Sequence, residues 1–298
     1  MKEYPTYFYK YRSSKNVFHL DALFKSYSWI SSRKEFIALD PNDSKIDFND
    51  ITVRQLKIKR NENRNNKFLY RKFDKLYNKG CFTDEGRELL STLEIKKNFD
   101  NLIDSYKLYC VAGNGDNEIL WNQCADNDPT KPNDFCVELK AEEMKKAANN
   151  EKAQEMIYQT ELAKLDLVDF LPDFFLYEKK LKENKPTFIS VDNEIEKSHL
   201  VLVAKITKAL SVKLCKYREE NEYRFTFSGK FSINQTGEKK TYPREFIEAI
   251  IFGYNANQET KKIIVENMPY PVKYKQASQV NGVIQINDLH KPYDFLAI

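Results

Sequence analysis

Residues 216–227 constrain the fold of this chain most, because charged and aromatic side chains alternate there with a period of two. Side chains of a β-strand point to opposite faces in turn, so the pattern predicts a strand with one charged and one aromatic face. The aromatic face can bury against a core. The charged face would carry Glu220, Glu222, Arg224 and Thr226, and the aromatic face Tyr223, Phe225 and Phe227.

The charged face of this predicted strand has two interpretations. Two neighbouring carboxylates raise the pKa of one of them, and a nearby arginine lowers it again, a combination that is common at catalytic sites. An antiparallel strand that meets water also carries charges on its solvent face, without any function. The pattern by itself favours the solvated face.

The composition indicates a chain that can form a sizeable core. Its 298 residues are enough for one large domain or two smaller ones, and 20 Phe and 18 Tyr supply much of the apolar area. The formal net charge of +4 is too small to mark a nucleic-acid-binding protein by itself. Gly occurs only 8 times, and the sequence has neither a dinucleotide-binding nor a phosphate-binding glycine motif.

The five cysteines and three histidines predict neither a disulfide framework nor a metal site. The cysteine number is odd, no two cysteines have the spacing of a zinc site, and the histidines are dispersed. A reduced, cytoplasmic compartment is therefore expected. We also expect no membrane partner, because no secretory signal and no apolar run of membrane-spanning length is visible. Export without such a signal remains open.

The order of the patterns predicts a single α+β domain over residues 1–298, with a helical, basic insertion over residues 54–106. Strands are expected at residues 7–12, 28–32, 108–112, 135–139, 170–177, 272–274 and 283–286, and helices at residues 18–27, 69–77, 83–106, 139–166 and 195–210. Residues 246–252 indicate a buried strand or a passage from helix to strand. The ten Lys and Arg of residues 54–79 could guide a nucleic acid or a polyanionic cofactor, although such runs more often form a solvated helix face.

Four segments along residues 7–265 stand out together. They are Phe8–Ser13 with Ser28–Ser31, Leu120–Asn127 with Phe135–Leu139, Lys213–Tyr217 leading into Glu220–Phe225, and Ile247–Gly253. In order and spacing, they resemble the bacterial uncharacterised domain family DUF 2971. Two of its patterns are not kept: Asn-Asp-Pro-Phe-Asp is absent after the second strand, and Trp-Ser-His-Tyr-Ala is replaced by Trp-Asn-Gln-Cys-Ala at residues 121–125.

This layout in turn resembles the ADP-ribosyltransferase fold, which implies a mixed, mainly antiparallel split sheet and NAD as cofactor. Such enzymes present an Arg on a first strand, a Ser on a second and a late Glu-x-Glu pair. The matching positions are Arg12, then Ser31 or Ser32, and Glu220 with Glu222. The resemblance implies catalytic roles for two of them: Glu222 would stabilise positive charge on the ribose, and Glu220 would act as general base.

The same resemblance implies a cofactor site. Arg12 would hold a phosphate or the ribose of NAD, Ser31 would orient the nicotinamide side, and Tyr11 would stack on the nicotinamide ring. Arg224, beside Glu222, completes this predicted set.

The function implied is that of an NAD-dependent ADP-ribosyltransferase or NAD glycohydrolase acting on a macromolecular target, protein or nucleic acid, in a bacterial toxin or an antiphage defence effector. The alternative is a nucleic-acid- or protein-binding module of a defence or phage system, without catalytic activity. A steep salt dependence of nucleic-acid affinity without NAD consumption would favour that module. A nuclease is a third class, which no set of metal ligands in the sequence supports.

Overall fold

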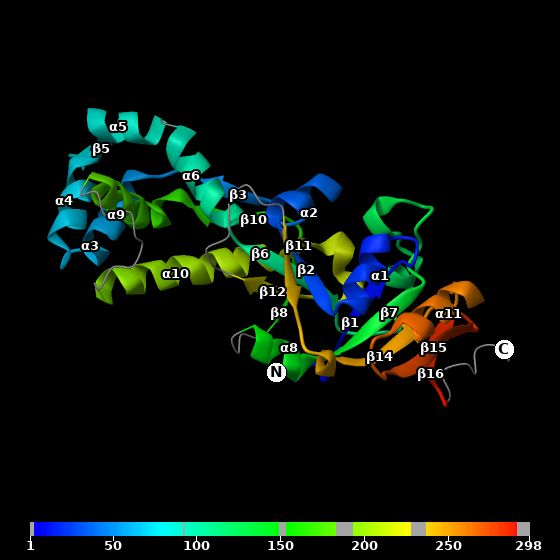
Figure 1. Cartoon of the computed structure of the whole chain (residues 1–298). Helices are drawn as coiled ribbons and strands as arrows, with labels where there is room; N and C mark the ends of the chain where they lie inside the picture. Colours follow the sequence, from blue (N-terminus) through cyan, green and yellow to red (C-terminus); the bar gives the residue numbers. More distant parts are fainter. Residues whose placement is uncertain (1–2, 92, 149–152, 183–192, 228–236, 291–298) are drawn as a thin grey trace. The chain divides into compact units, whose positions relative to one another are not determined.

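The computed structural model describes residues 3–91, 93–148, 153–182, 193–227 and 237–290. The fold is mixed α+β with a mainly antiparallel open sheet (Figure 1). Contacts within the chain divide it into two compact units. Unit 1 consists of Met1–Asp43, Tyr106–Thr160 and Lys213–Ile298, and unit 2 of Ser44–Ser105 and Glu161–Val212. The basic segment expected as an insertion over residues 54–106 thus shares a compact unit with a second, later segment.

Unit 1 contains the large sheet and the short helices around it. Its strands are β1 (Tyr7–Arg12), β2 (Tyr27–Ser32), β6 (Lys107–Ala112), β7 (Phe135–Lys140), β8 (Gln154–Glu155), β9 (Ile157–Gln159), β11 (Val212–Leu214, at the chain boundary of the unit), β12 (Glu222–Phe227), β13 (Gly237–Thr241), β14 (Ile247–Phe252), β15 (Lys273–Val280) and β16 (Val283–Leu289). Its helices are α1 (Val17–Phe24), α2 (Arg33–Leu39), α7 (Glu118–Asn122), η1 (Ala125–Asn127), α8 (Ala141–Ala147), η3 (Cys215–Glu220), η4 (Arg244–Phe246) and α11 (Gln258–Asn267). The strands predicted by alternation at the start of the chain and around residues 108–139 are confirmed.

The large sheet divides at one edge of β6. The strand order is β13-β2-β6-β1-β7-β14-β15-β16, and β12 pairs with β6 and β8. β12 runs antiparallel to β6 over its whole length and so occupies one edge. The other edge is shared, since β2 pairs with Lys107 and Leu108 whereas β1 pairs with Ala112. Between these two pairings, the Nζ of Lys10 donates a hydrogen bond of 2.6 Å to the carbonyl oxygen of Cys110.

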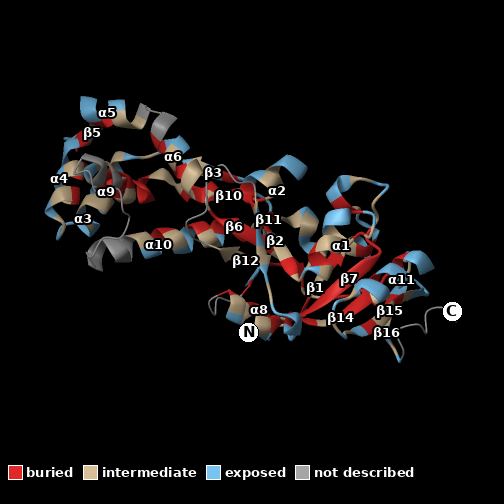
Figure 2. Ribbon diagram, viewed as in Figure 1, coloured by how far each residue is buried: buried red, intermediate tan, exposed pale blue. Residues whose placement is uncertain are grey.

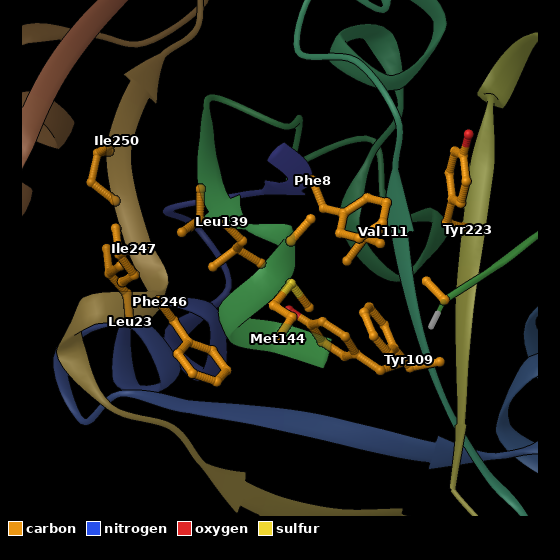
Figure 3. Close-up of a cluster of buried hydrophobic side chains, with 14 of the residues drawn as sticks. Phe8, Leu23, Tyr109, Val111, Leu139, Met144, Tyr223, Phe246, Ile247 and Ile250 are labelled. Atoms are coloured by element: carbon orange, nitrogen blue, oxygen red, sulfur yellow. The ribbon is translucent and has the colours of Figure 1, made fainter. Parts of the chain in front are cut away.

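The core of unit 1 covers both faces of this sheet. The first five residues of β7 are all buried, as expected for a strand that is covered on both sides (Figure 2). On one face, the rings of Phe8 and Tyr223 lie 5.2 Å apart within the apolar cluster shown in Figure 3. On the other face, Tyr11 packs edge-on against Trp121. Trp121 is fully buried and donates its indole N–H to the carbonyl oxygen of Gly115, so it belongs to the core and is not placed to stack on a ligand.

Unit 2 combines helices with a two-stranded parallel sheet. Its elements are β3 (Ile46–Asn49), α3 (Val53–Glu62), α4 (Lys67–Lys75), β4 (Tyr77–Asn78), β5 (Cys81–Phe82), α5 (Asp84–Ser91), α6 (Leu93–Asp104), β10 (Ala163–Asp166), η2 (Leu167–Asp169), α9 (Leu171–Lys182) and α10 (Asn193–Leu210). β10 pairs with β3, which joins the two segments of the unit. The amphipathic helix predicted around residues 69–77 is confirmed as α4. It is capped by Asn66 and buries Leu69 and Phe73.

Two elements predicted from composition are wrong. The polar helix predicted over residues 139–166 is limited to α8, and the later part forms β8, β9 and β10, because Ala163 and Leu165 alternate into the core and β10 finds a partner in β3. The strand predicted over residues 170–177 is helix α9. Its aromatic residues have helical spacing, and the ring of Phe175 packs 5.5 Å from that of Phe73 on α4.

Candidate functional site

The charged stretch that follows β11 is half 3-10 helix and half strand, which corrects the prediction of one continuous strand. η3 ends at Glu220, and Asn221 then adopts a left-handed conformation with φ of 47° before β12 begins. Asn is among the residues that tolerate this conformation. The carbonyl oxygen of Asn221 accepts a 2.8 Å hydrogen bond from the backbone of Gly113, which fixes the turn beside β6. Glu220 and Glu222 therefore come from different elements.

The two carboxylates nevertheless meet, because one ammonium group contacts both. The Nζ of Lys213 on β11 lies 2.6 Å from a carboxylate oxygen of Glu220 and 2.6 Å from one of Glu222. Arg224 donates through Nε to the other oxygen of Glu222 and through Nη2 to Asp43, at 2.6 Å. Asp43 also lies 3.6 Å from the Nζ of Lys213. These five residues, which we call the carboxylate cluster, all belong to unit 1.

Burial excludes one of the two interpretations of the charged face, the solvated strand face. Glu222 is 7% exposed and Arg224 is not exposed at all, so this is not a solvated strand face. Phe36 covers the guanidinium of Arg224, whose central carbon lies 5.3 Å from the ring centroid. Ionic groups so far from water are costly unless they are paired, and the cluster supplies two cations for three carboxylates.

The cluster moves the pKa values of its two glutamates in opposite directions. Burial alone would raise the pKa of Glu222, but Arg224 and Lys213 outweigh it and hold that pKa well below its ordinary value of 4.5. Burial raises the pKa of Glu220, and Lys213 offsets this only in part. The guanidinium of Arg224 donates to Glu222, and this second cation lowers the pKa of Glu222 further than Lys213 does alone. Relative to a glutamate in water, the cluster thus favours the ionised form of Glu222 and the protonated form of Glu220.

The structure brings together three of the six predicted site residues. Glu220, Glu222 and Arg224 lie in the carboxylate cluster, whereas the described contacts of Tyr11 and Arg12 are elsewhere in unit 1. The hydroxyl of Tyr11 donates to the carbonyl oxygen of Asn114, and its ring is held in the core. Ser31 lies on β2, opposite Leu108 of β6 and Gly237 of β13.

Arg12 lines a small hollow together with Lys10 and His19. The hollow has a volume of about 20 Å³, which is room for a water molecule but not for a nucleotide. Burial, and then the charge of Arg12, lower the pKa of Lys10 to about 8. The same two causes, with a further contribution from Lys10, lower the pKa of His19 to about 2. Cationic groups thus gather here without a carboxylate among the lining residues.

Sequence reasoning missed Lys213 and Asp43, the two residues that complete the cluster. Asp43 follows the Asp-Pro-Asn sequence of residues 40–42, which indicates only a turn. Lys213 lies between Val212 and Leu214, and a lysine within a short apolar run is a signal of a buried, paired cation. Its partners could not be named from that signal.

Comparisons with known proteins neither support nor contradict the resemblance to DUF 2971 and to the ADP-ribosyltransferase fold. No family model, no curated protein and no solved structure matches this chain. Among the described residues, no three His, Cys, Asp or Glu side chains are grouped so that they could hold a metal ion. In the same residues, no helix has both the length and the apolar character needed to cross a membrane.

Proposed function

We propose that this protein is an NAD-dependent ADP-ribosyltransferase-like enzyme that cleaves the bond between nicotinamide and ribose. The observation that carries the proposal is the glutamate pair on Lys213: one carboxylate stays ionised and its neighbour has a raised pKa. Two carboxyl groups with pKa values pushed apart are the arrangement that acid and base catalysis at a sugar carbon requires.

In this mechanism the two glutamates have separate tasks. As nicotinamide leaves with the electron pair of the glycosidic bond, positive charge develops on the ribose, and the ionised Glu222 stabilises it. Glu220 accepts the proton of the incoming nucleophile, which forms the new bond to the same ribose carbon. The nucleophile is a side chain or base of a macromolecular acceptor, or water in the hydrolytic reaction. Lys213 and Arg224 are positioning residues that hold Glu222 in place.

The topology of the sheet supports the same assignment. The shared edge of β6 is a feature expected of the split sheet in the ADP-ribosyltransferase fold. The hollow that Arg12 and Lys10 line lies on the face of the sheet that carries Val137 and Leu139, opposite to Glu222 and Arg224, so it is not part of the proposed catalytic site. The resemblance to DUF 2971 points to a bacterial toxin or an antiphage defence effector as the setting.

The test is NAD cleavage by the purified full chain, with Glu222→Gln as the variant and Glu248→Gln as the matched control. Glu248 is a carboxylate of β14 paired with Lys140 and Lys273 and has no part in the proposed mechanism. We expect Glu222→Gln to lower the rate of NAD cleavage about 100-fold or more, because a preorganised charge is lost. The control variant should cleave NAD at the wild-type rate. Unchanged cleavage by Glu222→Gln would remove this residue from the mechanism.

A second candidate is a binding module without catalytic activity, which the complete pairing of Glu222 and Arg224 favours. Structural ion-pair networks also shift pKa values, so the cluster alone does not separate the two functions. Thermal unfolding with millimolar NAD separates the two functions, because a ligand that binds only the folded state raises the melting temperature. The wild-type chain should be stabilised by NAD if it is the enzyme, and neither stabilised nor able to consume NAD if it is the module.

A further inference from the structure

The helical pair α3–α4 carries an excess of positive charge that is larger than the net charge of the whole chain. Residues 53–75 contain nine Lys and Arg but only two acidic residues, a net charge of +7. The whole chain has +4, so the remaining residues together carry −3. The charge is therefore concentrated on one structural feature of unit 2, made of two adjoining helices.

Three of the nine cations have carboxylate partners. Arg60 donates to Asp74 at 2.7 Å and lies over the ring of Tyr70, which fastens α3 to α4. Lys59 contacts Glu62 and Asp169, both at 2.8 Å. Lys72 lies 3.6 Å from Glu178 of α9. The two acids of the segment are thus already engaged by cations of α3, Glu62 by Lys59 and Asp74 by Arg60.

The other six cations are exposed and have no carboxylate partner among the described residues. They are Arg54, Lys57, Arg64, Lys67, Arg71 and Lys75. Lys67, Arg71 and Lys75 are spaced by four residues along α4, so they form one stripe with a rise of about 6 Å between neighbours. The buried side of the same helix carries Leu69 and Phe73. These six residues are called the cationic surface below.

The composition of the cationic surface fits a nucleic acid better than a protein partner. The central part of a protein interface is depleted of lysine and enriched in apolar and aromatic groups. On α3 and α4, Ile58 is the only large apolar side chain among the exposed ones. A nucleic acid instead presents repeated phosphates, about one per 1.7 Å of duplex axis, so each cation of a stripe can meet a charge. Interfaces with nucleic acids are strongly positive for this reason.

We infer that the cationic surface binds the phosphodiester backbone of a nucleic acid without reading its sequence. The surface belongs to unit 2, and the inference does not rest on the function proposed for unit 1. Backbone contacts by lysine and arginine supply nearly all of non-specific binding, and they make the affinity fall steeply with salt. Binding of this kind would hold the chain on a nucleic acid without requiring a particular site.

The experiment measures the affinity of the full chain for a labelled DNA duplex of about 20 base pairs as salt rises from about 50 to 200 mM, where six phosphate contacts predict about a 1,000-fold loss. The variant Lys57→Gln/Lys67→Gln/Lys75→Gln removes half of the contacts and should show only about a 40-fold loss over the same range, from a weaker starting affinity. Far-ultraviolet circular dichroism verifies that α3 and α4 remain folded.

Two further variants keep the result interpretable. Lys15→Gln/Lys208→Gln/Lys262→Gln makes the same charge change at exposed lysines elsewhere and should bind as the wild type does. Lys57→Arg/Lys67→Arg/Lys75→Arg keeps the charge and should also bind. A single strand of the same length should bind with a shallower salt slope, as single strands do. The inference is overturned if the wild type does not bind, if both glutamine variants lose affinity equally, or if only vesicles of anionic lipid are bound.

Discussion

Replacing Lys213 by methionine removes a cation that contacts both glutamates of the carboxylate cluster. At an effective dielectric constant of about 20, each of its two 2.6 Å contacts represents about 6 kcal/mol of gross attraction, most of which offsets the cost of burying the ammonium group. Removing one partner of a buried ion pair leaves the other charge uncompensated and costs about 3–5 kcal/mol. We therefore expect Lys213→Met to lower the free energy of unfolding by that amount at neutral pH.

The measurement is urea denaturation followed by tryptophan fluorescence, supported by thermal melts in which about 3–5 kcal/mol corresponds to a decrease of about 6–20 °C for a unit of this size. Lys164→Met is the matched control, because Lys164 is half exposed and forms an exposed ion pair with Glu161. Exposed ion pairs contribute about 0–1 kcal/mol, so this variant should melt close to the wild type. In the double variant Lys213→Met/Glu220→Gln, part of the loss should be recovered, since one unpaired carboxylate is removed.

The dependence of the free energy of unfolding on pH has a definite sign. The pKa of Glu222 in the folded chain lies below its ordinary value of 4.5, so its contribution to stability is present above pH 4.5 and is lost as the pH falls further. Without Lys213, this contribution is smaller. The difference between wild type and Lys213→Met should therefore narrow below about pH 4.5. A variant that loses less than about 1 kcal/mol at neutral pH, or a difference that does not change with pH, would refute the reasoning.

Two further predictions concern other parts of the chain. A Cβ at Gly86 would lie 2.1 Å from the carbonyl oxygen of Leu76, so Gly86→Ala should destabilise unit 2 by about 1–3 kcal/mol in urea denaturation, whereas Ala at the exposed neighbour Glu85 should be nearly neutral. Burial and the charges of Arg12 and Lys10 lower the pKa of His19 to about 2, so the folded chain excludes a proton that the unfolded chain binds below pH 6.5. The wild type should lose up to about 1.4 kcal/mol per pH unit below 6.5 relative to His19→Asn, and parallel stability curves for the two would contradict the prediction.

The accuracy of sequence-based prediction followed the length and regularity of each pattern. Helix α4 could be predicted because Leu69 and Phe73 are four residues apart and face one side, a relation that holds within the helix itself. The structure of the segment after α8 could not be predicted. Its Lys- and Glu-rich composition favours a helix, but pairing with β3 makes its last part, β10, a strand. Propensity is a weak preference that a distant partner overrides.

The sequence by itself indicated an acidic pair beside an arginine in unit 1 and determined where the excess charge of unit 2 lies. It marked Glu220, Glu222 and Arg224 as neighbours, because they are close along the chain. Only the tertiary structure decided that Asp43, 181 positions before Arg224, and Lys213 complete the cluster. It also decided that Lys213, Glu222 and Arg224 are buried. Pairing over such a distance depends on strand register and on the course of the chain between the strands, which no local period encodes.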